Sequence, residues 1–210
     1  MYPKPLIVVA TESEIAPSIP FLMEHKIPYI ITGVGMLATT HALTKALYSC
    51  TPSYVLNIGI AGSFSRHLAI GSVIEVVQDT FSELGAEDEN GFITIDELGF
   101  GISSWPNQSK DGIRTNLAQV DAITVNKVHG NILSIESIRR RLPEVQVESM
   151  EGAAIFYVCH KENVPCMQVR SISNYVEIRD KSAWDIPLAV QNLNRWLANF
   201  LISYPTSFLR

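Results

Sequence analysis

The chain has 210 residues, of which 47% are apolar and 18% charged, and its formal net charge is −5. That length suits one large α/β domain, and the apolar content is sufficient for a sizeable core. The negative charge, with no basic cluster longer than 139–141, argues against nucleic acid as a partner, and the lack of an apolar run of roughly 20 residues argues against a membrane.

Apolar, β-branched runs alternate with segments of helical period along most of the chain. Strands are expected at 5–10, 27–35, 54–62, 72–81, 120–128, 145–149 and 165–172. Helices are expected at 13–26 (interrupted), 37–50, 134–142, 150–162 and 186–203. This order predicts a single domain over residues 1–210, with a mixed, twisted β-sheet flanked by helices on both faces. The stretch 82–116, rich in Gly, Asp, Glu and Ser, is expected to be a long irregular excursion or a short hairpin.

The three cysteines, Cys50, Cys159 and Cys166, contain no C-x-x-C pair. The N-terminal residues also lack the apolar region and the small-residue cleavage site of a signal peptide. Reduced thiols and a cytoplasmic location are therefore expected, and neither a metal site nor a cofactor is predicted.

Two glycine-containing segments follow predicted strands. Residues 33–38, "GVGMLA", form a loose dinucleotide fingerprint, but the next strand gives "NIG" at 57–59 where a Rossmann site needs an acid. The turn is therefore a tight strand-to-helix connection, or one that lets the backbone approach another small ligand. The second segment, 59–62, is either a simple bend or a place where backbone N–H groups face a ligand.

Two acidic residues stand where predicted strands give way to helices. Glu151 precedes an almost wholly apolar helix, so it either favours the helix dipole or is partly buried and binds a partner such as sugar hydroxyls. Glu14 is either a helix cap or a second carboxylate of the same crevice, and two carboxylates with few cations favour activating water over binding an anion. His129 is either a loop or core histidine or a flat ring that stacks on a base.

Polar residues follow six of the predicted strands. They lie at 11–14, 33–36, 59–62, 126–129, 148–151 and 170–174. Ligands of open α/β sheets bind in the crevice outside the strand ends, so we expect these six segments to meet at one edge of the sheet.

The segment "VESMEGAAIFYVCHKENVPCMQVRSISN", with the glycine turns and the early acid, resembles the purine nucleoside phosphorylase and nucleosidase superfamily over nearly the whole chain. Within it, "SNYVEIRDKSAWDIPLAV" is most similar to the futalosine-hydrolysing branch. The resemblance implies a nucleoside phosphorylase-like fold. It also implies an enzyme that hydrolyses the N-glycosidic bond of futalosine and releases hypoxanthine in menaquinone biosynthesis. It further implies a homo-oligomer, a dimer or a tetramer, in which Phe81 and the 82–116 excursion contribute to a neighbour's pocket.

The resemblance also implies roles for individual residues. Glu14 would activate water, Glu151 would bind ribose hydroxyls, and Arg170 and Ser173 would lie beside the water and the base. Asn174 stands where adenosine-type nucleosidases have an aspartate, and its N–H₂ group suits the two acceptors of hypoxanthine, although a flipped amide would also serve adenine. Glu14, Asn174 and Arg170 are the expected catalytic residues. The expected substrate-binding residues are Glu151, Met150, Ile60, Ala61, Gly62, Val128, His129 and Ser173.

Three other functions stay open: a methylthioadenosine/S-adenosylhomocysteine nucleosidase, a purine nucleoside phosphorylase and a non-catalytic nucleoside-binding protein. Retention of both Glu14 and Glu151 argues against the last of these. Futalosine also carries a carboxylated aromatic group, which should meet a cation. Arg66, Arg179 and Lys181 are candidates for that contact, although each also suits an ordinary surface charge.

Overall fold

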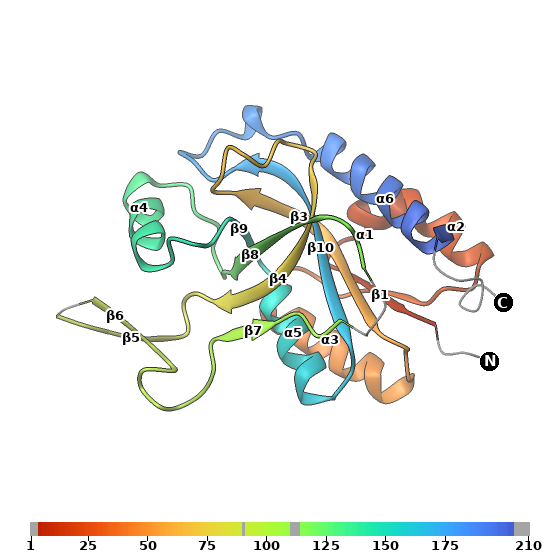
Figure 1. Cartoon of the computed structure of the whole chain (residues 1–210), viewed down its shortest axis with the longest axis horizontal. Coiled ribbons are helices and arrows are strands. Elements are labelled where there is room, and N and C mark those ends of the chain that lie inside the picture. The colour runs from red at the N-terminus through yellow and green to blue at the C-terminus, as the bar shows by residue number, and fades with distance from the viewer. Residues whose placement is uncertain (1–3, 90, 110–113, 204–210) are drawn as a thin grey trace.

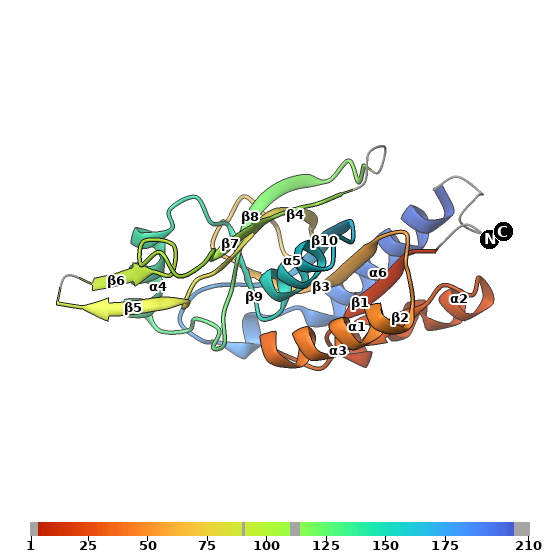
Figure 2. The same cartoon turned by 90° about the horizontal axis from the view of Figure 1, so that it is seen from below.

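The computed structural model describes residues 4–89, 91–109 and 114–203, which form a mixed β-sheet covered by helices on both faces (Figures 1 and 2). The predicted fold class is confirmed. The strands are β1 (Leu6–Val9), β2 (Tyr29–Ile31), β3 (Val55–Ser63), β4 (Val73–Phe81), β5 (Gly85–Asp88), β6 (Gly91–Thr94), β7 (Ser104–Pro106), β8 (Ala118–Thr124), β9 (Val147–Ser149) and β10 (Cys166–Tyr175). The helices are α1 (Glu12–Ile15), η1 (Ala16–Ser18), α2 (Ile19–Glu24), α3 (Met36–Ser49), α4 (Ile132–Arg141), α5 (Gly152–Lys161), η2 (Lys181–Ala183) and α6 (Ile186–Ser203).

Strand β3 is the centre of the sheet. It pairs in parallel with β1 and β10 and antiparallel with β9. Strand β10 pairs with β4, β4 with β8, and β8 with β9, so these five strands form a closed circuit of pairings that resembles a small barrel. Strand β2 extends the sheet beyond β1, and β7 pairs with β4. The sequence predicted the mixed sheet but not this closure.

Two of the three apolar clusters lie on opposite faces of the sheet. In Figure 1, α3 and α5 lie on one side of the strands, and α6 and α2 lie on the other. Leu43 of α3 and Phe156 of α5 pack with buried residues of the sheet in the first core. Leu22 of α2 and Leu197 of α6 do so in the second. This burial holds the strand ends in a fixed arrangement, because packed interiors leave side chains little room to move.

Most differences from the predicted elements lie in the chain between β4 and β8. The 82–116 excursion contains the predicted short hairpin, β5 with β6, which projects from the body of the molecule (Figure 1). It also contains β7, a short strand that the sequence did not predict. Residue 90 and residues 110–113 of the excursion lie outside the described residues. Elsewhere, Pro17 and Pro20 divide the predicted first helix into α1, η1 and α2.

The three cysteines are free in the structure. Over the part of the chain that the structure describes, no helix combines the length and apolarity needed to cross a bilayer. The same residues contain no cluster of three or more His, Cys, Asp or Glu side chains that could hold a metal ion.

Gly152, the first residue of α5, lies against buried polar side chains of the sheet. A Cβ atom at this position would collide with Asp79 Oδ2 and with Gln168 Oε1, both of which are hydrogen-bonded and buried. Helix α5 therefore approaches the sheet this closely only because residue 152 has no side chain.

Gly152→Ala is expected to lower the free energy of unfolding by about 2–3 kcal/mol, because overpacking a buried site displaces its neighbours. The expected destabilisation is opposite to the usual effect of a Gly-to-Ala exchange in a helix, which stabilises the protein by up to about 1 kcal/mol. Urea unfolding of both proteins measures the difference. Gly101→Ala is the control, because a Cβ there would come no closer than 3.5 Å to Ile95, and an equal loss in both variants would contradict the argument.

Candidate active site

A cavity of about 320 Å³ lies where the six predicted strand ends meet. It is lined by Ala10, Thr11, Ser13, Glu14, Val34, Ile60, Ala61, Gly62, Val128, His129, Glu148, Ser149, Met150, Glu151, Ser173, Asn174, Trp184 and Ile186. Ten of the eleven residues that the sequence analysis assigned to a site are in this set. The exception is Arg170, which lies beneath the cavity.

Glu14 is both a helix-capping residue and a cavity residue. Its Oε2 accepts hydrogen bonds from Thr11 N at 3.0 Å and Thr11 Oγ1 at 2.7 Å, which fixes the start of α1. Its Oε1 accepts from Ile60 N of β3 at 3.1 Å. The two interpretations of Glu14 are thus compatible, and the carboxylate is held between the ends of two neighbouring strands.

Glu151 is held by the glycine turn that follows β2. Gly35 N donates to Glu151 Oε1 at 2.9 Å, and Gly35 adopts φ +96°, a backbone conformation that favours glycine. The turn therefore brings its backbone N–H to a carboxylate of the cavity, and its Val34 side chain lines the same cavity. Burial raises the pKa of Glu151, the Arg170 charge and the Gly35 N–H lower it, and the Glu14 charge raises it further.

A β-bulge explains why Ser173 and Asn174 both face the cavity. Successive residues of a strand normally point to opposite faces, but the pairing of β10 with β3 shifts between Ile172 and Asn174. Ser173 Oγ donates to Asn174 Oδ1 at 2.8 Å, and Asn174 Nδ2 donates to Tyr175 O at 3.0 Å. The carboxamide is thereby oriented, and Nδ2 has a second N–H to offer a ligand.

His129 and Glu148 form a pair in the cavity wall. His129 Nδ1 lies 2.5 Å from Glu148 Oε2, and His129 N donates to Glu148 Oε1 at 3.0 Å. The imidazole also meets the ring of Phe64 edge-on, with centroids 6.1 Å apart. The ring is consequently fixed in orientation at the cavity, as a base-stacking residue would need to be.

Arg170 is 1% exposed and takes part in a hydrogen-bond chain beneath the cavity. Its Nε donates to Gln168 Oε1 at 2.8 Å, and its Nη2 donates to Asn57 Oδ1 at 2.7 Å. Gln168 Nε2 in turn donates to Asp79 Oδ2 at 2.9 Å, and Thr124 Oγ1 donates to Asp79 Oδ1 at 2.8 Å. Burial raises the pKa of Asp79 to about 6, against the lowering effects of these two hydrogen bonds and of the Arg170 charge.

The sequence analysis missed several residues of the cavity. Glu148 was noted at its strand end but given no role, and Trp184 and Ile186 were not singled out. Trp184 had a usable signal, because it is a large aromatic residue in the charged stretch 177–185 that follows a strand end.

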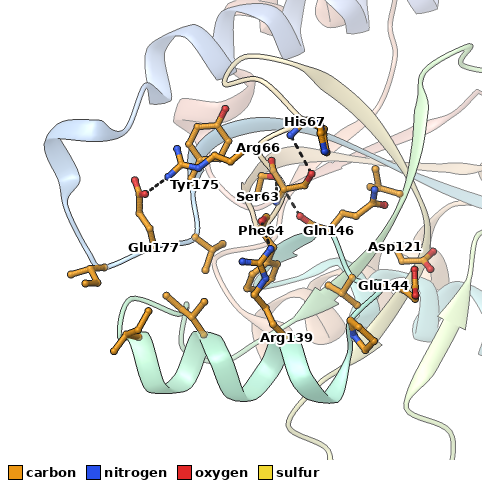
Figure 3. Close-up of a pocket in the computed structure, with 18 of the residues that line it drawn as sticks. Ser63, Phe64, Arg66, His67, Asp121, Arg139, Glu144, Gln146, Tyr175 and Glu177 are labelled. Carbon is orange, nitrogen blue, oxygen red and sulfur yellow. Dashed lines mark hydrogen bonds and ion pairs between the residues drawn. The ribbon is translucent and has the colours of Figure 1, made fainter.

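A second, larger cavity of about 1100 Å³ contains none of the predicted site residues. Its wall includes Arg66, whose guanidinium lies over the ring of Tyr175 and pairs with Glu177 at 2.5 Å (Figure 3). Arg66 therefore lines a different hollow from Glu14 and Glu151, and its charge has a partner.

Comparison with known proteins identifies the family to which the chain belongs. The family model described as the phosphorylase superfamily matches residues 20–203, which is most of the chain. The chain belongs to the phosphorylase superfamily. The resemblance stated from the sequence is thus confirmed.

Two curated relatives of this superfamily member are named futalosine hydrolase. One, from Streptomyces coelicolor, is 30% identical over 143 residues, covering 66% of this chain and 61% of that protein, so the chain matches less than two thirds of its length. The other, from Acidothermus cellulolyticus, is 31% identical over 178 residues, covering 80% of this chain and 72% of that protein.

Solved structures of the superfamily share the fold at low sequence identity. Futalosine hydrolase of Helicobacter pylori has a TM-score of 0.77 at 19% identity, covering 95% of this chain and 97% of that one. The 5'-methylthioadenosine/S-adenosylhomocysteine nucleosidase of Neisseria meningitidis, in complex with methylthio-immucillin-A, also scores 0.77, at 18% identity, covering 95% and 99%. Both likenesses show the fold alone.

Asp79 is expected to give the stability of the protein a distinctive pH dependence. Its pKa rises from the usual 3.8 to about 6, so the folded protein holds this proton more tightly than the unfolded chain does. The contribution of Asp79 to stability is therefore greatest at low pH and declines as the pH rises through about 6. The difference between these two pKa values corresponds to ~3 kcal/mol in the free energy of unfolding.

Urea unfolding of the wild type and of Asp79→Asn between pH 4.5 and pH 7 measures this effect. The free energy of unfolding of the wild type, minus that of the variant, should fall as the pH rises, because only the wild type must release the proton. A difference that stays constant or grows over this range would contradict the raised pKa.

Proposed function

We propose that this chain hydrolyses the N-glycosidic bond of a purine nucleoside, with futalosine as the substrate and hypoxanthine as the leaving group. The observation that carries the proposal is the charge of the cavity. Glu14, Glu148 and Glu151 line it, whereas its lining residues include no lysine or arginine. A positive charge that develops on the sugar is stabilised there, but phosphate, the nucleophile of a phosphorylase, would be repelled.

Glu14 is the group that we assign to water activation. Its carboxylate is buried and its position is fixed by Thr11 and Ile60, so it needs no rearrangement to meet a water molecule in the cavity. It takes a proton from that water as the oxygen bonds to the anomeric carbon, and the electron pair of the glycosidic bond leaves with the base. General base catalysis of this kind contributes about 10²–10⁴-fold to the rate.

Glu151 is the group that we assign to the ribose hydroxyls. The Gly35 N–H orients the carboxylate, and Met150 beside it provides an apolar surface for the sugar. Bond cleavage gives the sugar oxocarbenium character, and hydrogen bonds between the hydroxyls and a carboxylate strengthen as that charge grows. The raised pKa of Glu151 has burial as its largest cause, and a sugar that carries positive charge would favour the ionised form.

Asn174 supports hypoxanthine as the leaving group. Hypoxanthine presents acceptors at O6 and N7, and Asn174 Nδ2 has an N–H for them, while Ser173 and Tyr175 hold the amide in that orientation. His129 offers a fixed ring to the base. The names of the two curated relatives also support futalosine as substrate.

We also infer that the protein works as a homo-oligomer, a dimer or a tetramer, in the cytoplasm. The 82–116 excursion supports association with a second copy, because Phe100 and Ile102 are 81% and 56% exposed. Large exposed apolar side chains of this kind are typical of interfaces.

The purified protein is expected to release hypoxanthine from futalosine without added phosphate. Its kcat/KM for futalosine should exceed that for methylthioadenosine by about tenfold or more, because adenine places a donor where hypoxanthine has an acceptor. Chromatographic measurement of the released base tests both points. A preference for methylthioadenosine, or turnover that depends on phosphate, would show that one of the alternative functions is correct.

Glu14→Gln is expected to lower kcat by about 10²–10⁴-fold, because an amide cannot accept the proton of the attacking water. Circular dichroism should show that the fold persists. Glu12→Gln is the matched control: Glu12 belongs to the same helix, is exposed, and does not line the cavity, so its kcat should change by less than about twofold. Wild-type turnover by Glu14→Gln would remove Glu14 from the mechanism.

A further inference from the structure

Part of the cavity wall is apolar and partly open to solvent. Val34 is 55% exposed and Ile186 is 40% exposed, and Trp184 lies with them in the wall. The base and the ribose hydroxyls have their proposed partners in Asn174 and Glu151. The apolar, open part therefore suits a portion of the substrate that is neither the base nor the hydroxyl groups.

A cation lies beside this part of the cavity. The guanidinium carbon of Arg179 is 5.0 Å from the centroid of the Trp184 ring. Arg179 N donates to Gly130 O at 3.1 Å, and Gly130 directly follows the cavity residue His129. Arg179 is thus fixed between two segments that line the cavity, although its own side chain remains exposed.

The carboxylates near Arg179 in the sequence have other partners. Glu177 pairs with Arg66. Asp180 Oδ1 accepts from Ser182 N at 2.9 Å at the start of η2, and Asp185 Oδ1 accepts from Leu188 N at 3.0 Å in the first turn of α6. In the described ranges, Arg179 has no ion pair within 4.0 Å. Its charge is therefore available to a ligand, unlike that of Arg66.

We propose that Arg179 and Trp184 form a specificity subsite for an aromatic or apolar substituent that ends in a carboxylate. The proposal rests on the proposed function, and it names the residues that would bind the carboxylated end of futalosine. The substituent packs against Trp184 and Ile186, and its carboxylate accepts hydrogen bonds from the guanidinium, whose planar fork matches a carboxylate. The charge of Arg179 also favours an anionic group at the rim, where the glutamates that line the cavity would otherwise repel it.

Arg179→Ala tests the subsite with three substrates: futalosine, its methyl ester, and inosine, which has the same base and ribose without the carboxylated arm. The variant should lose about tenfold in kcat/KM for futalosine, since a charge-assisted hydrogen bond is lost. Its kcat/KM for the neutral ester and for inosine should stay within about twofold of wild type. Arg66→Ala is the matched control and should leave all three values unchanged, because Arg66 lines the other cavity.

The outcomes separate the subsite from the proposed function. If the wild type releases hypoxanthine from neither futalosine nor inosine, the proposed function is wrong and the subsite falls with it. If the wild type hydrolyses futalosine but Arg179→Ala affects all substrates equally or none, the function stands and the subsite is wrong. A loss confined to the carboxylated substrate, with partial recovery in Arg179→Lys, supports the subsite.

Discussion

The burial of the Arg170 guanidinium is the constraint on which the site depends. An ionised group is costly to remove from water unless it is hydrogen-bonded, and Arg170 donates from Nε to Gln168 and from Nη2 to Asn57. Through Gln168 the chain reaches Asp79 and Thr124, and Asn57 Nδ2 extends it to the backbone of β1. Side chains of β3, β4, β8 and β10 are therefore linked beneath the cavity, and their ends cannot shift independently.

The same chain imposes two glycines on the sequence. A Cβ at Gly59 would collide with Arg170 Nη1, and a Cβ at Gly152 would collide with Asp79 and Gln168. Gly59 and Gly152 are thus needed by the layer of polar side chains under the site, and not only by a ligand above it. The positive charge of Arg170 also lowers the pKa of Glu151, so one buried cation supports a cavity whose lining carries several carboxylates.

Much of this site could be predicted from the sequence, because local patterns determine where strands end and parallel strands bring their ends together. Glu14, Glu151 and Asn174 were placed in one crevice on that basis. What could not be predicted depends on pairing between distant segments. The closed circuit of strands, the bulge that turns Ser173 and Asn174 to the same side, and the return of Trp184 to the cavity are all of this kind.

The capping role of Glu14 has an evolutionary consequence. Since the carboxylate that faces the cavity also accepts the Thr11 N–H and the Ile60 N–H, it stabilises α1 and its contact with β3 whether or not a reaction takes place. A descendant of this protein that no longer hydrolysed anything would still be selected to keep the residue. Retention of Glu14, used above as an argument against a non-catalytic protein, is therefore weaker evidence than the sequence alone suggested, and residues without a structural role are better markers when active relatives are separated from inactive ones.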